Sequence, residues 1–122
     1  MKLMIPVDEK NMQTDVCISF GRAPYFMLYD TDSQTAEFID NDAVHRQGGA
    51  GIRAAQLISD FHPDALLTPR CGDNAADVIK GAGIPMMKAI KGKATDNVQA
   101  YKEGRLEVLG ETHPGLHQHG GC

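Results

Sequence analysis

The chain lacks three features: an excess of basic residues, a long apolar run and any paired cysteine motif. Its formal net charge is -4 at pH 7, which argues against general nucleic-acid binding, because that activity needs a basic surface. No apolar run approaches the roughly 20 residues of a membrane span. The short apolar start meets Asp8 and Glu9 at once, unlike a signal peptide. We therefore expect a cytoplasmic protein with no nucleic-acid or membrane partner.

Cysteine is scarce, since the chain has three cysteines and no Cys-x-x-Cys pair. An odd number without a recurrent spacing fits reduced thiols better than a disulfide framework. Catalytic motifs are also missing, since the sequence contains no G-x-S-x-G, no P-loop, no H-E-x-x-H and no EF-hand spacing. We expect a protein that is not an enzyme.

The sequence does have the pattern of one α/β domain of ordinary size. Short apolar runs and helical periodicities follow one another in the order β-β-β-α-β-α-β-α. Strands are predicted over 3–7, 25–29, 35–39, 65–68 and 85–90, and helices over 51–61, 73–80 and from a Thr95 cap to near Gly104. Pro6 should stand at the end of its strand, because proline cannot donate to a ladder.

Because βα units require parallel pairing, these elements predict a five-stranded mixed sheet flanked by helices. The domain is predicted to cover residues 1–109. Residues 110–122 contain histidine and cysteine but no apolar period, and they predict a flexible tail.

Cations and glycines fall at the predicted carboxyl ends of the strands, where open α/β sheets bind ligands. Helix N-termini at the same edge offer unpaired N–H groups and the positive end of the helix dipole. The set predicts an anion-binding pocket, although surface cations beside turn glycines would give the same pattern. The candidate residues are Arg22, Gly48, Gly49, Gly51, Arg70, Cys71, Gly72 and Lys91.

Cysteines and histidines are candidate metal ligands. Cys71 lies at a strand-to-helix turn, where the dipole can lower a thiol pKa, and thiolates are soft donors for copper(I), zinc and iron–sulfur clusters. Cys17 is expected near the same edge, but either cysteine could instead be a small buried apolar residue. His45 precedes the glycines and could face the pocket. The tail predicts either a weak metal site or a segment with no binding role. Its candidate ligands are His113, His117, His119 and Cys122.

The segment SFGRAPYF at 19–26 resembles the signature of the dinitrogenase iron–molybdenum cofactor biosynthesis family, which includes NifX-like and orange-protein-like members. The run GGAG at 48–51 is similar to the family's glycine loop, and CGDNA at 71–75 resembles a turn of the orange-protein branch. Segments 82–85 and 101–106 also match. The resemblance extends to about Leu109.

The resemblance implies a ribonuclease-H-like fold and a carrier or scaffold for a metal–sulfur cluster, either an iron–molybdenum cofactor precursor or a molybdenum–copper sulfide. It also implies partners of the ParA/Mrp ATPase type or other cofactor-assembly proteins. Arg22 and residues 48–51 correspond to signature positions, but no cysteine ligand set carries over. An interaction or regulatory module without a cluster is the main alternative. A phosphodiester-cleaving enzyme would need clustered carboxylates that the sequence lacks, and a zinc protein would need the tail.

Overall fold

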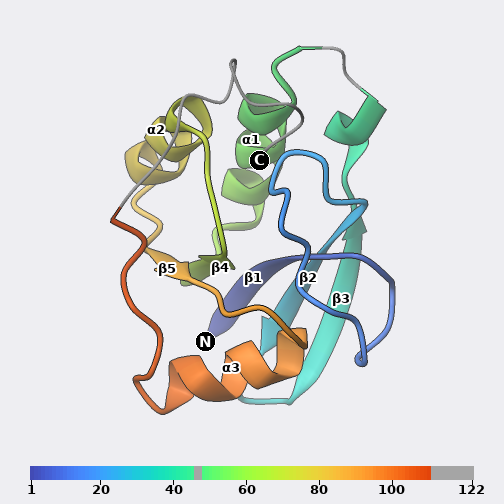
Figure 1. Ribbon diagram of the computed structural model, residues 1–122, viewed down its shortest axis with the longest axis vertical. Coiled ribbons are helices and arrows are strands. Elements are labelled where there is room, and N and C mark those ends of the chain that lie inside the picture. Colours follow the sequence, from blue (N-terminus) through green and yellow to red (C-terminus); the bar gives the residue numbers. More distant parts are fainter. Residues whose placement is uncertain (46–47, 111–122) are drawn as a thin grey trace.

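The computed structural model describes residues 1–45 and 48–110 (Figure 1). The predicted order of elements is confirmed, with a short 3-10 helix, η1, added before the first α-helix. The strands are β1 Lys2–Val7, β2 Tyr25–Asp30, β3 Thr35–Asp40, β4 Ala65–Thr68 and β5 Met86–Lys88. The helices are η1 Asp42–His45, α1 Ala50–Phe61, α2 Asp73–Gly81 and α3 Ala94–Lys102.

The five strands form one mixed sheet in the order β3-β2-β1-β4-β5. The first three pair as an antiparallel meander, and β4 and β5 add to β1 in parallel. This order fits the ribonuclease-H-like topology, so the predicted fold class is confirmed. Because β1, β3, β4 and β5 all run in one direction, the loops that follow them gather at a single edge of the sheet.

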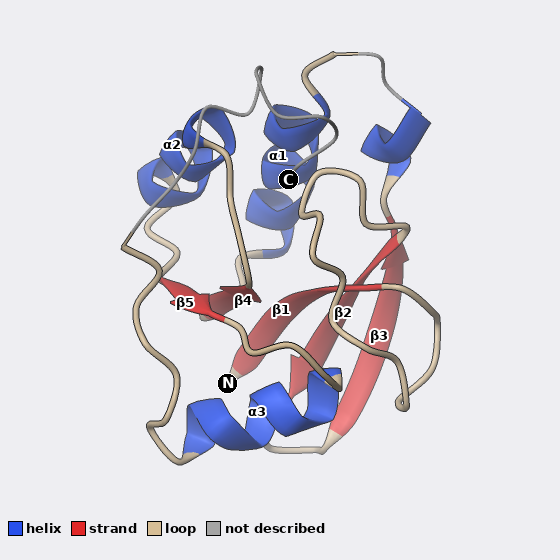
Figure 2. Cartoon of the chain, in the orientation of Figure 1, coloured by secondary structure: helices blue, strands red, loops and turns tan. Residues whose placement is uncertain are grey.

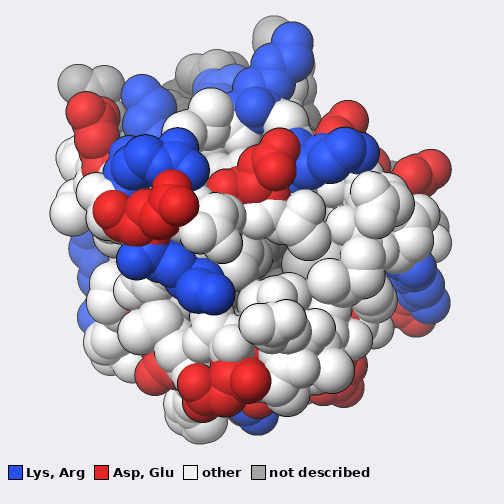
Figure 3. Space-filling model, turned by 90° about the horizontal axis from the view of Figure 1, so that it is seen from below, with Lys and Arg blue, Asp and Glu red and all other residues white. Residues whose placement is uncertain are grey.

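Helices cover both faces of the sheet. Figure 2 shows α1 and α2 on one side and α3 alone on the other. Figure 3 shows the molecule from the α3 side, where acidic and basic side chains alternate around uncharged surface. None of the helices described in the structure has the length and apolar character that crossing a bilayer requires.

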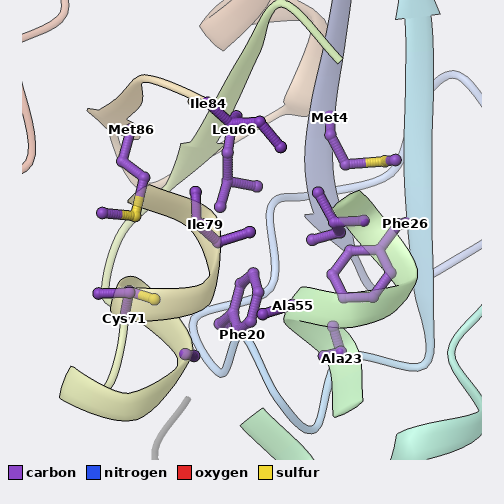
Figure 4. Close-up of a cluster of buried hydrophobic side chains, with 14 of the residues drawn as sticks. Met4, Phe20, Ala23, Phe26, Ala55, Leu66, Cys71, Ile79, Ile84 and Met86 are labelled. Carbon is purple, nitrogen blue, oxygen red and sulfur yellow. The ribbon is translucent and has the colours of Figure 1, made fainter. Parts of the chain in front are cut away.

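Each face of the sheet has its own hydrophobic cluster. Under α1 and α2, side chains from the helices meet Met4, Phe26 and Leu66 of the sheet and Phe20 of the loop before β2 (Figure 4). Under α3, Leu3, Ile5 and Leu67 meet residues of that helix. The strand β4 is buried at all four positions, which explains why Ala65, Leu66 and Leu67 follow one another without polar alternation.

Pro6 lies one residue before the end of the central strand β1, close to its predicted place. It stands opposite Phe26 of β2, and its carbonyl oxygen accepts a hydrogen bond from the Cys17 N–H (2.8 Å). Its backbone nitrogen therefore also points away from β2, toward the β4 side. Pairing with β4 ends at Met4 and Leu66, before Pro6, which has no N–H to continue the ladder.

Two local predictions were wrong. The strand β5 spans three residues and ends before Ala89, because the chain there turns toward α3. Thr95 is not the cap of α3, since the helix already includes Ala94 and its N-cap is Lys93. The Ala94 N–H donates to the Thr14 carbonyl oxygen (3.0 Å). A backbone partner from the loop after β1 thus satisfies the N–H of the first residue of the helix.

Residues 106–109 cover the outer edge of the sheet. The Lys88 N–H donates to the Glu107 carbonyl oxygen (2.7 Å), and the Leu109 N–H donates to that of Met86 (2.9 Å). Leu106 and Leu109 are buried on opposite faces of the sheet. This segment pairs backbone groups that an exposed edge strand would leave open to other chains.

Candidate functional site

The carboxyl edge of the sheet beneath α1 and α2 holds most of the residues that the sequence singles out. The loops 8–24 and 69–72 and the segment 41–45 all lie there, because each adjoins the same end of a neighbouring strand. The N-termini of α1 and α2 are at this edge as well. Open α/β sheets bind ligands in this position.

Both of these helices begin at a glycine. The N-cap of α1 is Gly49, in the left-handed region with φ 70°, and the N-cap of α2 is Gly72, which is extended. Neither N-cap makes a side-chain hydrogen bond to the helix, and the first turn of α1, which contains Gly51, has no acidic residue. A Cβ placed on Gly48 or Gly49 would meet no heavy atom within 4 Å. The first turn of α1 therefore carries the positive end of the helix dipole with no side-chain cap and no acidic residue to offset it.

The signature loop before β2 is fastened to η1 by two side chains. Arg22 donates through Nη1 to the Val44 carbonyl oxygen (3.2 Å). Asn41, only 2% exposed, donates through Nδ2 to the carbonyl oxygens of Gly21 (3.2 Å) and Ala23 (2.8 Å). Its Oδ1 also accepts the Ala43 N–H (3.1 Å). Arg22 is thus held against η1.

Sequence analysis missed Asn41. The only local sign of it is an asparagine directly after a strand, a position where its side chain often accepts a hydrogen bond from a backbone N–H two residues on. Its two carbonyl partners are 18 and 20 residues away in the chain. No short-range pattern could have revealed them.

The turn between β4 and α2 presents Arg70 but encloses Cys71. Arg70 is exposed, and its carbonyl oxygen accepts a hydrogen bond from Thr68 Oγ1 (2.8 Å). The Cys71 side chain is fully buried beside α2 in the same cluster as Phe20 and Met86 (Figure 4). Buried in this way, a cysteine packs as a small apolar residue. A ligand role for Cys71, which stays a prediction, would require this turn to open.

Lys91 is placed apart from the glycines. It lines a hollow of about 340 Å³ that is built largely from α3. The sheet separates α3 from α1 and α2 (Figure 2). The predicted anion pocket is therefore divided, with Arg22, Arg70 and the glycines on the α1–α2 side and Lys91 on the α3 side.

Cys17 is a half-buried thiol in the loop after β1. Its Sγ donates to the Ser19 carbonyl oxygen (3.6 Å). Burial is the largest cause that raises the pKa of this thiol, from 9.0 to about 11. Asp8 adds to the rise, while a hydrogen bond donated by the Ser19 backbone opposes it. The residue is protonated at neutral pH and is a poor nucleophile and a poor metal ligand in this state.

We expect iodoacetamide to alkylate Cys17 roughly 100-fold more slowly at pH 7 than an unperturbed cysteine, because thiolate is the nucleophile and its fraction falls tenfold for each unit of pKa. The rate should continue to rise up to pH 11. Mass spectrometry of the Cys17 peptide after timed alkylation measures it, and the same chain unfolded in urea is the control. Equal pH profiles for folded and unfolded protein would contradict the expectation.

The described residues hold no group of three or more His, Cys, Asp and Glu side chains placed to bind one metal ion. Several predicted ligands lie outside the described residues. These are the side chain of His45 and the tail residues His113, His117, His119 and Cys122.

Residues 1–104 match the family model of the dinitrogenase iron-molybdenum cofactor proteins. The chain belongs to this family. The match covers most of the chain and includes the signature loop, the glycines before α1 and the turn before α2. It confirms the family that the sequence resemblance indicated.

Solved structures agree with membership of the dinitrogenase iron-molybdenum cofactor family. The apo orange protein from Desulfovibrio gigas is 26% identical, with a TM-score of 0.85 over 89% of this chain and 92% of that chain. A Thermotoga protein described as a candidate NifB protein of the DUF35 family is 30% identical, with a TM-score of 0.78 over 90% and 94%. A candidate dinitrogenase from Methanocaldococcus jannaschii, 18% identical with a TM-score of 0.69 over 91% and 96%, shares the fold. No curated protein matches the chain.

Proposed function

We propose that this protein binds an anionic metal–sulfur cluster at the carboxyl edge of the sheet beneath α1 and α2, and carries it as cargo. The cargo is an iron–molybdenum cofactor precursor or a molybdenum–copper sulfide. One observation carries the proposal: two helices begin at this edge with glycine N-caps that have no side-chain cap, beside the family signature loop. Helix N-termini of this kind favour anions.

The chemistry of the edge suits a polyanion with soft sulfide atoms. Backbone N–H groups of α1 would donate to the sulfides, and the guanidinium groups of Arg22 and Arg70 would offset the negative charge. Contacts of this kind are moderate in strength and reversible, which a carrier requires because it must release its cargo. No step of carrying needs a catalytic group, so we propose that the protein is not an enzyme.

Cargo transfer implies partners. We propose that the protein works in the cytoplasm with cofactor-assembly proteins or with an ATPase of the ParA/Mrp type. The description of the Thermotoga relative as a candidate NifB protein supports the first kind of partner.

An interaction module that binds no cluster is the second candidate function. Two large apolar side chains favour it, since Ile18 in the signature loop is 57% exposed and Ile52 in the first turn of α1 is 36% exposed. Exposed apolar side chains are typical of protein contacts when they form a patch. Cargo binding separates the two functions.

Anaerobic apoprotein mixed with tetrathiomolybdate and copper(I), then desalted, should retain stoichiometric molybdenum and show a charge-transfer band. Arg70→Gln should weaken retention about tenfold or more, because a charge-assisted hydrogen bond contributes roughly 1.5–3 kcal/mol. Metal and sulfide analysis and the visible spectrum measure the result.

The matched control for this experiment is Lys80→Gln, which removes an exposed cation from the other end of α2. It should retain the cargo as the parent chain does. Cys71→Ala tests ligation separately: unchanged retention would assign Cys71 to packing, and loss of molybdenum from a folded variant would assign it to the cargo. A colourless, metal-free parent protein would refute this cargo and favour the interaction module.

A further inference from the structure

A second candidate site lies on the α3 side of the molecule, away from the glycine N-caps. The loop after β5, the helix α3 and Arg105 line an open hollow of about 340 Å³. This is at the small end of ligand pockets, which span about 300–1,000 Å³. Figure 3 shows this side of the molecule, with charges of both signs around uncharged surface. The lining residues are Ile90, Lys91, Asp96, Asn97, Gln99, Ala100 and Arg105.

The floor of the hollow is held in shape by Asn97, which is 2% exposed. Its Oδ1 accepts the Ile90 N–H (2.7 Å), and its Nδ2 donates to the carbonyl oxygens of Ile90 (2.8 Å) and Lys93 (3.1 Å). These three bonds tie the loop after β5 to α3. The hollow is therefore formed by the fold itself and does not wait for a ligand to create it.

One wall positions a guanidinium group. Glu103 accepts hydrogen bonds from Arg105 Nε (2.7 Å) through Oε1 and from Gln99 Nε2 (2.9 Å) through Oε2. The bond to Glu103 uses only one of the five N–H groups of Arg105. The two terminal amino groups of the guanidinium remain available as donors for a carboxylate.

The remaining charges are of opposite sign and do not neutralise one another. Within residues 1–45 and 48–110, Lys91 and Asp96 form no ion pair with each other, although both line the hollow. The lining also includes apolar groups of Ile90, which is 52% exposed, and of Ala100. A simple anion would meet the Asp96 carboxylate, and a simple cation would meet Lys91 and Arg105. A molecule with both charges and an apolar part matches the whole lining.

We propose that this hollow binds a small zwitterion of the amino-acid type. Lys91 and the terminal amino groups of Arg105 hold the carboxylate, Asp96 holds the ammonium group, and the apolar side chain lies against Ile90 and Ala100. The site is independent of the proposed cluster cargo, because α1 and α2 contribute nothing to its lining.

The test is a titration of the full isotope-labelled chain followed by amide NMR, with three probes that share one apolar body. L-Leucine carries both charges, 4-methylpentanoate only the carboxylate, and 3-methylbutylamine only the ammonium group. Leucine should shift the amide signals of residues 90–105 with a Kd of about 1 mM. Each singly charged probe should bind at least roughly fivefold more weakly, since it loses about 1 kcal/mol of charge contact.

Two variants assign the charges. In Lys91→Met, leucine should lose most of its advantage over 3-methylbutylamine but not over 4-methylpentanoate. In Asp96→Asn, the pattern should be reversed. Lys80→Met, which removes an exposed cation of α2 on the other side of the sheet, should leave all three affinities unchanged. Equal binding of the three probes, shifts outside residues 90–105, or no shift at tens of millimolar leucine would overturn the proposal.

Discussion

Replacing Phe20 with alanine should lower the free energy of unfolding by about 3–5 kcal/mol. The Phe20 side chain comes from a loop, yet it is fully buried in the cluster beneath α1 and α2 (Figure 4). Its ring centroid is 5.7 Å from that of Phe26. Removing the ring leaves a cavity that surrounding helices and strands can fill only in part. Urea denaturation of the parent and variant chains measures the loss.

Phe61→Ala is the matched control, because Phe61 packs against the same cluster but is only partly buried at the end of α1. It should cost about 1–2 kcal/mol. A Phe20 variant that lost no more stability than the Phe61 variant would show that the loop packs loosely in solution, and it would contradict the structure at this point.

The burial of Phe20 also bears on what the family signature means. Within SFGRAPYF, the side chains of Phe20, Ala23 and Phe26 are fully buried. These positions serve the core. Arg22 is only partly buried and holds η1 through Val44. Recognition of the signature therefore identifies the fold more firmly than it identifies a cargo.

The fold could be predicted because its elements have strong local patterns. The apolar run of β4, the hairpin between β2 and β3 and the periodicities of α1 and α2 are all visible in the sequence. The order of the strands in the sheet has no such local pattern, because it depends on contacts between distant segments. Only the family resemblance indicated it. The start of α3 was misplaced for the same reason: the donor of Ala94 is satisfied by Thr14, 80 residues earlier.

The candidate site could be predicted only to the level of a sheet edge. The carboxyl ends of parallel strands must meet, so cations and glycines in the following loops must fall at one edge. The face of the sheet on which each of these side chains lies depends on the direction in which its loop turns. Lys91 lies beside α3, and Cys71 is enclosed in the core, although both follow strands of the same direction. Neither outcome can be read from residue type and spacing.

Asn41→Ala should lower the free energy of unfolding by about 2–4 kcal/mol and should also weaken cargo retention. The substitution leaves the carbonyl oxygens of Gly21 and Ala23 and the N–H of Ala43 without their side-chain partner. Each buried polar group left unpaired costs roughly 1–3 kcal/mol, less where water can enter. Because the same bonds fasten the loop that bears Arg22 to η1, the guanidinium should lose its fixed place beside η1. Urea denaturation and the thiomolybdate assay measure the two effects.

Asn97 of α3 provides a control of the same chemistry, because it is equally buried and its side chain also bonds three backbone groups. Those groups belong to Ile90 and Lys93, in the loop before α3. Asn97→Ala should lose similar stability, keep the cluster cargo and lose the leucine-induced shifts. Asn41→Ala should do the opposite for the two ligands. If both variants lost cargo in proportion to their loss of stability, Asn41 would support the fold in general and would have no special part in shaping the carboxyl edge. A crossed result would instead show that each buried asparagine shapes one ligand site, and that the two sides of this sheet work independently.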